Sequence, residues 1–204
     1  MGMEAHCRAH YGKKVSDGKA FLESEVLSFR GDFRVSIPFA DIRKVEAKGA
    51  DLHVEGAGGL LVLEIGPAAK KWASKIADPP TRLQKLGVED GFVVSIYGIF
   101  EPGFLEELAA AGARIAPEPA KNSDLVLVSA DNVGHLASVP RASEHVAGRG
   151  ALWIVYPKGQ RAITQSDVMT AGRGTGMVDV RVASFSPTHT ALKFVVPVHR
   201  RGNR

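Results

Sequence analysis

Short apolar segments follow one another so closely between residues 19 and 65 that no helix fits between them. Each alternates apolar and polar residues or is rich in β-branched ones, as strands are, and the intervening RGD, AKGAD and EGAGG are turn sequences. Connections this short join antiparallel strands, because a parallel crossover needs a much longer segment. The predicted strands cover residues 19–23, 26–29, 34–39, 42–47, 51–56 and 59–65.

A helix is predicted directly after these strands, at residues 67–77 (PAAKKWASKIA). Pro67 suits the first helical turn, and Ala69, Trp72 and Ile76 share one face. Antiparallel strands followed by one closing helix are the order of a pleckstrin-homology-like β-barrel, and FRVSIPFADIRKVEA (33–47) resembles the GRAM-type members of that superfamily. The resemblance covers about a third of the chain and implies a small barrel of a type commonly used as an interaction scaffold.

The sequence pattern changes at residues 78–91, DPPTRLQKLGVEDG, where Pro79 and Pro80 end the helix. Within this segment TRLQKLG (81–87) can form a short helical turn. Beyond this point, strands that are apolar on both faces alternate with helices, which indicates a mostly parallel, Rossmann-like sheet covered on both sides. The last two strands, VDVRVASFS and TALKFVVPV, are close enough to form an antiparallel hairpin. The fold class is therefore α+β and α/β in two domains. The expected divisions are a flexible N-terminus (1–18), a β domain (19–78), a linker (79–90), an α/β domain (91–199) and a basic tail (200–204).

The C-terminal half also resembles a known family through LWIVYPKG (152–159), GMVDVRV (176–182) and LKFV (192–195). It is similar to an uncharacterised family of small bacterial α/β proteins over residues 79–197, and its final hairpin is laid out as in a methyltransferase-like Rossmann sheet. That family has no established activity, so the resemblance implies no catalytic residues. The segment SPTHTA (186–191) departs from the turn that many members carry before LKFV.

Charge and cysteine content exclude several classes of function. Residues 1–78 contain 12 Lys and Arg against 11 Asp and Glu, residues 79–199 contain 11 of each, and three arginines follow in the tail. Neither half has the surplus of a nucleic-acid-binding domain, and three arginines are too few for stable membrane association. A single cysteine, Cys7, excludes an internal disulfide, and the sequence shows neither a signal peptide nor a membrane span, so we expect a soluble cytoplasmic protein.

The glycines of MTAGRGTGMVDVRV (169–182) look like a phosphate-binding loop. Such a loop follows a strand and precedes a helix, whereas this one follows a predicted helix and precedes a strand. We therefore interpret Gly172 as the helix end, and Gly174 and Gly176 as residues that let the chain turn.

Candidate ligand-binding residues follow the predicted parallel strands, because ligands of open α/β sheets bind at the carboxyl ends of strands. Glu118 lies 20 residues after Gly98, about the interval at which an acid meets a ribose in dinucleotide-binding folds. Against a cofactor, YGIFEPG supplies only two glycines, and Ile99 and Phe100 occupy the place where a phosphate would approach the backbone. The candidate cofactor-binding residues are Tyr97, Gly98, Glu118, Asp131 and Lys158.

Two further groups suggest chemistry but have simpler explanations. His6, Cys7 and His10 could ligate a metal but have no second Cys or His cluster, so no metal is predicted. Asp131 and His135 could form an acid–base pair on one helix face, although an acidic first helical turn explains them equally well.

Two functions remain after these exclusions. The first is a non-enzymatic binding or regulatory protein without a cofactor, whose partner would be another protein, since no coherent catalytic set is visible. The alternative is a Rossmann-like enzyme or sensor that binds a nucleotide or S-adenosylmethionine-like ligand through the candidate residues. The sequence does not define the oligomeric state.

Overall fold

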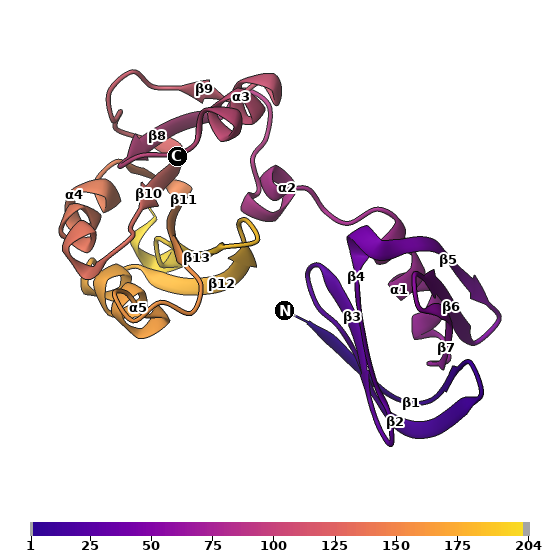
Figure 1. The fold of residues 1–204 in the computed structure, drawn as a ribbon. Helices are drawn as coiled ribbons and strands as arrows, with labels where there is room; N and C mark the ends of the chain where they lie inside the picture. Colours follow the sequence, from indigo (N-terminus) through magenta and orange to yellow (C-terminus); the bar gives the residue numbers. More distant parts are fainter. Residues whose placement is uncertain (1, 202–204) are drawn as a thin grey trace. The chain divides into compact units, whose positions relative to one another are not determined.

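The computed structural model describes residues 2–201 and is a mixed α/β structure with two sheets (Figure 1). The chain divides into two compact units, Met1–Pro80 and Thr81–Arg204. Each unit has its own sheet and its own buried core. The change at the paired prolines, from closely spaced strands to strands that alternate with helices, therefore coincides with the boundary between the units.

The N-terminal unit is a single antiparallel sheet of seven strands that curls into a half-barrel (Figure 1). The strand order is β4-β3-β2-β1-β7-β6-β5. A short 3₁₀ turn, η1 (Phe39–Asp41), precedes β5, and helix α1 (Ala68–Ala77) follows the last strand, burying Ala69, Trp72 and Ile76 as predicted. The strands are β1 (Met3–Tyr11), β2 (Lys14–Leu22), β3 (Val26–Arg30), β4 (Arg34–Pro38), β5 (Ile42–Lys48), β6 (Asp51–Gly56) and β7 (Gly59–Glu64).

The expectation of a flexible segment at residues 1–18 differs from the structure. From Met3 onward these residues form β1 and most of β2, paired in register from Met3–Leu22 to Tyr11–Lys14. The side chains of β1 that face the core include Cys7 and Ala9, which are buried but small. Their small size leaves the segment polar on average, and for this reason it does not stand out as a strand in the sequence. Met1 lies outside the described residues.

The expected linker at residues 79–90 also differs from the structure. Helix α2 (Arg82–Leu86) occupies part of it, with Thr81 and Gln84 forming a capping box at its start. The Leu86 side chain is buried, and its carbonyl accepts a hydrogen bond of 3.0 Å from Nε1 of Trp153 in the C-terminal core. From Thr81 onward this segment therefore belongs to the C-terminal unit.

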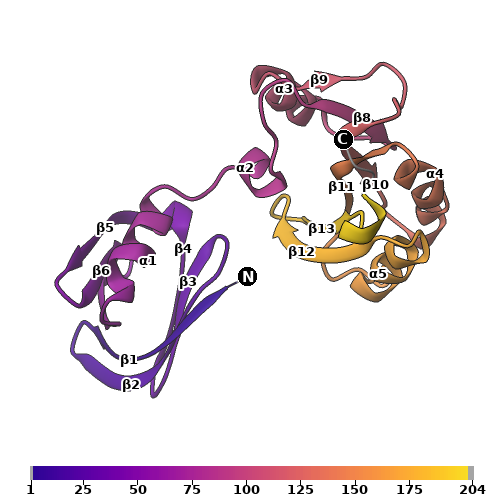
Figure 2. The same ribbon diagram turned by 180° about the vertical axis from the view of Figure 1, so that it is seen from behind.

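The C-terminal unit has a six-stranded sheet in the order β12-β13-β11-β10-β8-β9. β9, β8, β10 and β11 are parallel, and β13 and β12 form the predicted antiparallel hairpin. One buried cluster lies under α4 and α5, which pack together in both views (Figures 1 and 2), and another lies under α2 and α3. The strands are β8 (Val93–Tyr97), β9 (Arg114–Ile115), β10 (Ser123–Ser129), β11 (Val146–Pro157), β12 (Val178–Ser184) and β13 (His189–Val195). The helices are α3 (Pro102–Ala110), η2 (Val133–Ser138), α4 (Val139–Ser143), α5 (Gln165–Gly174) and η3 (Val198–Arg200).

The glycine-rich loop is a turn, as predicted, with Gly176 in its expected role, but Gly172 and Gly174 differ from the expectation. α5 continues to Gly174, and Gly176 (φ 77°) takes the left-handed conformation that reverses the chain. Gly172 lies inside the helix, where a Cβ atom would collide with the ring of Phe194. It therefore permits close helix–sheet packing and does not end the helix.

The first residues of the expected basic tail are packed against the C-terminal unit. Arg200 donates to the Gly176 carbonyl at 3.0 Å, and Arg201 donates to that of Val196 at 2.8 Å. The rest of the tail, residues 202–204, lies outside the described residues. No helix within residues 2–201 is long and apolar enough to span a bilayer.

Candidate ligand-binding site

The chain changes direction in the C-terminal sheet between β8 and β10. After β8 it passes through α3 to β9 on one side, and it then returns to β10 on the other side of β8. The loops that leave the carboxyl ends of β8 and β10 therefore diverge, as at the ligand-binding switch point of open α/β sheets. These ends are Tyr97–Gly98 and Ser129.

A crevice of about 430 Å³ lies at this point. A crevice of this size is within the range of small-molecule sites. The Ile99 side chain is 90% exposed and forms part of its wall. Asp131 is the one Asp, Glu, Lys or Arg among the described residues that line the crevice. The lining residues are Gly98, Ile99, Ser129, Asp131, Gly134, His135, Ala137 and Ser138.

Gly98 is required by the geometry of the crevice floor. Its φ of 85° lies in the left-handed region, and a Cβ atom there would be 2.9 Å from the Ser129 carbonyl oxygen. Only glycine fits this conformation so close to another backbone without strain. The end of β8 can therefore approach β10 closely and then turn away into α3.

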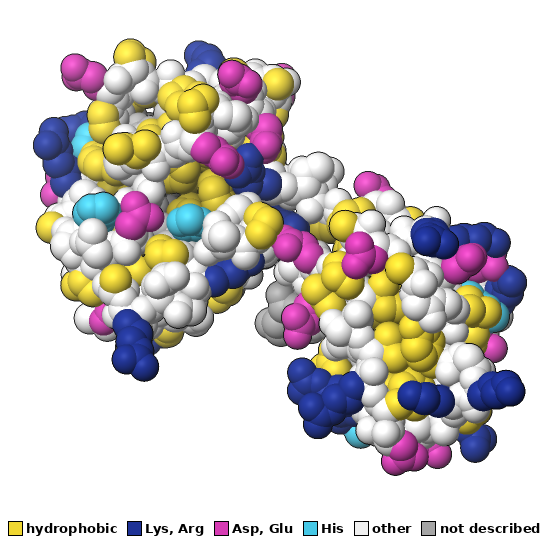
Figure 3. Space-filling model, in the orientation of Figure 1, with side chains coloured by type: hydrophobic (Ala, Val, Ile, Leu, Met, Phe, Trp, Pro, Cys, Tyr) yellow, Lys and Arg dark blue, Asp and Glu magenta, His cyan; other side chains and the backbone are white. Residues whose placement is uncertain are grey.

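Asp131 lies between two histidines from different segments. Its Oδ1 is 3.7 Å from Nε2 of His189 at the start of β13, and its backbone N–H donates to Nδ1 of His135 at 3.2 Å. The Asp131 side chain is 63% exposed and that of His189 is 34% exposed, so both can meet a ligand. Figure 3 shows histidine and acidic side chains beside apolar ones on this face of the unit.

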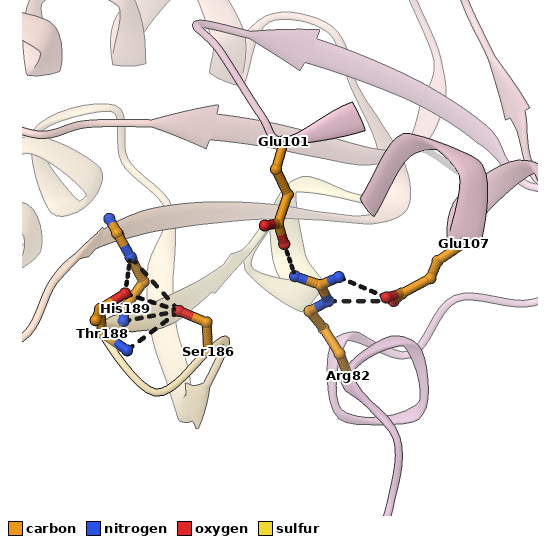
Figure 4. A network of polar contacts seen from close by, with 6 residues as sticks. All are labelled: Arg82, Glu101, Glu107, Ser186, Thr188 and His189. Carbon is orange, nitrogen blue, oxygen red and sulfur yellow. Dashed lines mark hydrogen bonds and ion pairs between the residues drawn. The ribbon is translucent and has the colours of Figure 1, made fainter. Parts of the chain in front are cut away.

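The loop before β13 holds His189 in place (Figure 4). Oγ of Ser186 accepts the backbone N–H groups of Thr188 (3.3 Å) and His189 (3.0 Å), which fixes a tight turn. Nδ1 of His189 is 2.9 Å from Oγ1 of Thr188. One ring nitrogen of His189 thus faces a hydroxyl and the other faces a carboxylate.

Arg82 forms a neighbouring network that is already saturated (Figure 4). Its guanidinium donates to Glu101 at 2.5 Å and to Glu107 at 2.6 Å, over the rings of Phe104 and Phe185. Burial alone would lower the pKa of Arg82, but the hydrogen bonds to the two carboxylates outweigh it and raise the pKa. This arginine anchors α2 and leaves little capacity for a ligand.

The structure brings only part of the predicted set together. Gly98 and Asp131 line the crevice. The Tyr97 hydroxyl is 2.9 Å from Nδ1 of His145, and burial raises the pKa of this tyrosine. Lys158 donates to Oγ of Ser184 and to the Ser186 carbonyl, and Glu118 lies exposed three residues beyond the end of β9.

His189 is the residue that sequence reasoning missed. SPTHTA signals only an unusual turn, and the pairing of β13 with β11 decides that its histidine reaches Asp131. His6 and His10 lie on one face of β1 and Cys7 on the other, because strand side chains alternate. Within residues 2–201, no three His, Cys, Asp or Glu side chains are placed to hold a metal ion.

Solved structures similar to this chain include several methyltransferases. A SAM-dependent methyltransferase from Aquifex aeolicus has 12% identity and a TM-score of 0.47, covering 59% of this chain and 92% of its own. A TehB-like SAM-dependent methyltransferase from Corynebacterium glutamicum has 12% identity and a TM-score of 0.45, covering 62% and 95%. A putative type 11 methyltransferase from Sulfolobus solfataricus has 12% identity and a TM-score of 0.44, covering 60% and 93%. No family model and no curated protein matches the chain.

These neighbours correct the main functional expectation from the sequence. A non-enzymatic binding or regulatory protein was expected, whereas the similar solved structures are described as methyltransferases. The expectation was wrong because it rested on the absence of a local catalytic motif. Asp131 lines the crevice and His189 contacts it from a segment far away in the sequence, so the two residues form no such motif.

Proposed function

We propose that the C-terminal unit is a Rossmann-like, methyltransferase-type enzyme domain whose ligand binds in the crevice between β8 and β10. The observation that carries this proposal is the coincidence of a 430 Å³ crevice with the point where the strand order reverses. For the N-terminal unit we propose a pleckstrin-homology- or GRAM-like half-barrel, supported by seven antiparallel strands followed by one helix.

The charge of the crevice favours an S-adenosylmethionine-like ligand over a nucleotide. No Lys or Arg is among the described lining residues, and the Asp131 carboxylate would repel a phosphate. The same carboxylate attracts a ligand with an ammonium or sulfonium group. Ile99 and Ala137 supply apolar surface for the rest of such a ligand.

The residues present therefore fit this cofactor. Asp131 would hold its ammonium group, the hydroxyls of Ser129 and Ser138 would bind its polar atoms, and Ile99 would contact its apolar part. When bound, such a group supplies an activated methyl for transfer to a nucleophile. An imidazole is well suited to accept a proton near neutral pH. His189 is the proposed base for the acceptor, with Nδ1 held by Thr188 and Nε2 accepting the proton.

Thermal unfolding of the full chain with S-adenosylmethionine or ATP tests this proposal. A ligand at about 100 times its dissociation constant stabilises the native state by about 2.7 kcal/mol, which raises the melting temperature by several degrees. We expect this rise with S-adenosylmethionine and its loss in Asp131→Asn. Glu106→Gln is the matched control, because it removes one exposed carboxylate from α3 away from the crevice.

Two results would contradict the proposal. One is a larger stabilisation by ATP than by S-adenosylmethionine. The other is an equal response of Asp131→Asn and the wild-type chain to S-adenosylmethionine, which would place the ligand elsewhere.

A further inference from the structure

Strand β5 of the N-terminal unit has one free edge. It stands at the end of the seven-stranded sheet and pairs, among residues 2–201, with β6 alone. The half-barrel is not closed between β4 and β5, since these strands are the two ends of the sheet. An edge strand presents backbone N–H and C=O groups that can pair with a further strand.

An apolar groove lies between this region and the C-terminal end of α1. It has a volume of about 540 Å³ and apolar walls that include Phe39, Ile42, Val45 and Ile76. Arg43 and Lys44 complete its rim. All of these residues belong to the N-terminal unit, so the groove is complete within it.

The surroundings of the groove are basic. Residues 41–48 and 68–78 contain six Lys and Arg against three Asp and Glu. Glu46 is shared by Lys44 (3.3 Å) and Lys48 (2.8 Å), and these contacts lower its pKa. Arg43 and the three lysines of α1 have no ion-pair partner in the described part of the chain. Figure 3 shows Lys and Arg side chains gathered at the upper right of this unit, where Figure 1 places β5.

From these three features we propose that the groove docks an extended segment of a partner protein, one that is rich in Asp and Glu and alternates them with apolar residues. The segment adds to β5 as a further strand, placing alternate side chains in the groove and the others against the basic rim. A lipid surface would satisfy the charge but not the free backbone edge of β5. The edge therefore decides in favour of a polypeptide.

Fluorescence anisotropy with the full chain tests the docking site. The probe is a labelled synthetic peptide of alternating glutamate and valine, and a second peptide carries N-methyl groups on alternate backbone amides. We expect the first to bind and the N-methylated peptide to bind at least about tenfold more weakly, because it cannot complete the strand pairing.

Charge-reversal variants locate the site. The double variant Arg43→Glu and Lys44→Glu should weaken peptide binding about tenfold, because it reverses both charges of the rim. The control, Lys13→Glu and Lys14→Glu, makes the same change in charge at the β1–β2 turn of the same unit and should leave binding within about twofold. Far-UV circular dichroism of both variants checks that they fold.

Several outcomes would overturn the proposal. These are an absence of peptide binding at millimolar concentration, equal weakening by the control variant, or equal binding of the N-methylated peptide. Binding to phosphatidylserine vesicles that is lost in the Arg43→Glu, Lys44→Glu variant, with no peptide binding, would assign the surface to anionic lipid instead.

Discussion

The two sheets of this chain bury their residues in different ways. In β11, the six residues from Ala151 to Tyr156 are all buried, because helices cover both faces of the C-terminal sheet. In β6 and β7 buried residues alternate with partly exposed ones, because the half-barrel has one core-facing side. The comparison shows why a crevice at strand ends belongs to the C-terminal unit. A sheet covered on both faces leaves only its edges and its strand ends open to a ligand.

The largest difference between the units is expected when two adjacent residues of one strand are each truncated to alanine and the losses in the free energy of unfolding are compared. In β10, Leu127 and Val128 are fully buried in different clusters, so Leu127→Ala should lower the free energy of unfolding by about 2–5 kcal/mol and Val128→Ala by about 1.5–3 kcal/mol. In β7, Leu63→Ala should be as costly as Leu127→Ala, whereas Val62→Ala should change the free energy by less than about 1 kcal/mol. Urea unfolding measures all four, and a Val62→Ala effect equal to that of Val128→Ala would remove the distinction.

Two glycines of α5 should show how closely this helix covers its sheet. Gly172→Ala places a methyl group against the Phe194 ring and should destabilise the chain by about 1–3 kcal/mol. Gly174→Ala in the same helix meets no atom within 4 Å and should be neutral or stabilise by up to about 1 kcal/mol. The melting temperatures of the two variants measure this difference. Similar values would mean that α5 packs less closely against the sheet than described.

Acid should affect the surfaces of the two units alike, and only slightly. The hydrogen bonds of Lys48 and Lys44 lower the pKa of Glu46 in the N-terminal unit, and that of Arg173 lowers the pKa of Asp179 in the C-terminal unit. A carboxyl group with a depressed pKa stabilises the fold above its unfolded-state pKa, and this stabilisation is lost as the pH falls through the folded-state value. Melting temperatures between pH 6 and about pH 3 should therefore fall less steeply in Glu46→Gln and in Asp179→Asn than in the wild-type chain. A steeper fall in either variant would mean that the replaced carboxylate does not stabilise the folded state at neutral pH.

Much of the fold could be predicted because many buried residues are large and regularly spaced. The strand at residues 59–65 and the helix face of Trp72 and Ile76 are of this kind. β1 could not be predicted, because its inward residues include Cys7 and Ala9, which bury well but add little apolar character to the sequence. The docking of α2 on the C-terminal core could not be predicted, because it depends on a hydrogen bond between Leu86 and Trp153, which lies 67 residues away.

The candidate site was less predictable, because it is made of loop ends. The positions of Gly98 and Asp131 follow from the rule about strand ends, since Gly98 directly follows β8 and Asp131 lies two residues beyond the end of β10. The contact of His189 with Asp131 depends on the register of an antiparallel strand, which local sequence does not encode. Lys158 satisfied the same rule but is held by the Ser184–Ser186 segment.

Because α2 is anchored to the C-terminal unit, a segment that folds as this unit has to include α2. A gene fusion or recombination event that joined this unit to another protein at Gly91 would remove Arg82 and the Leu86 carbonyl. The indole N–H of Trp153 would then have no acceptor inside the core, and Glu101 and Glu107 would lose their shared cation. α2 therefore has to be transferred together with the sheet, and a fusion that keeps the unit intact joins the chain before Thr81.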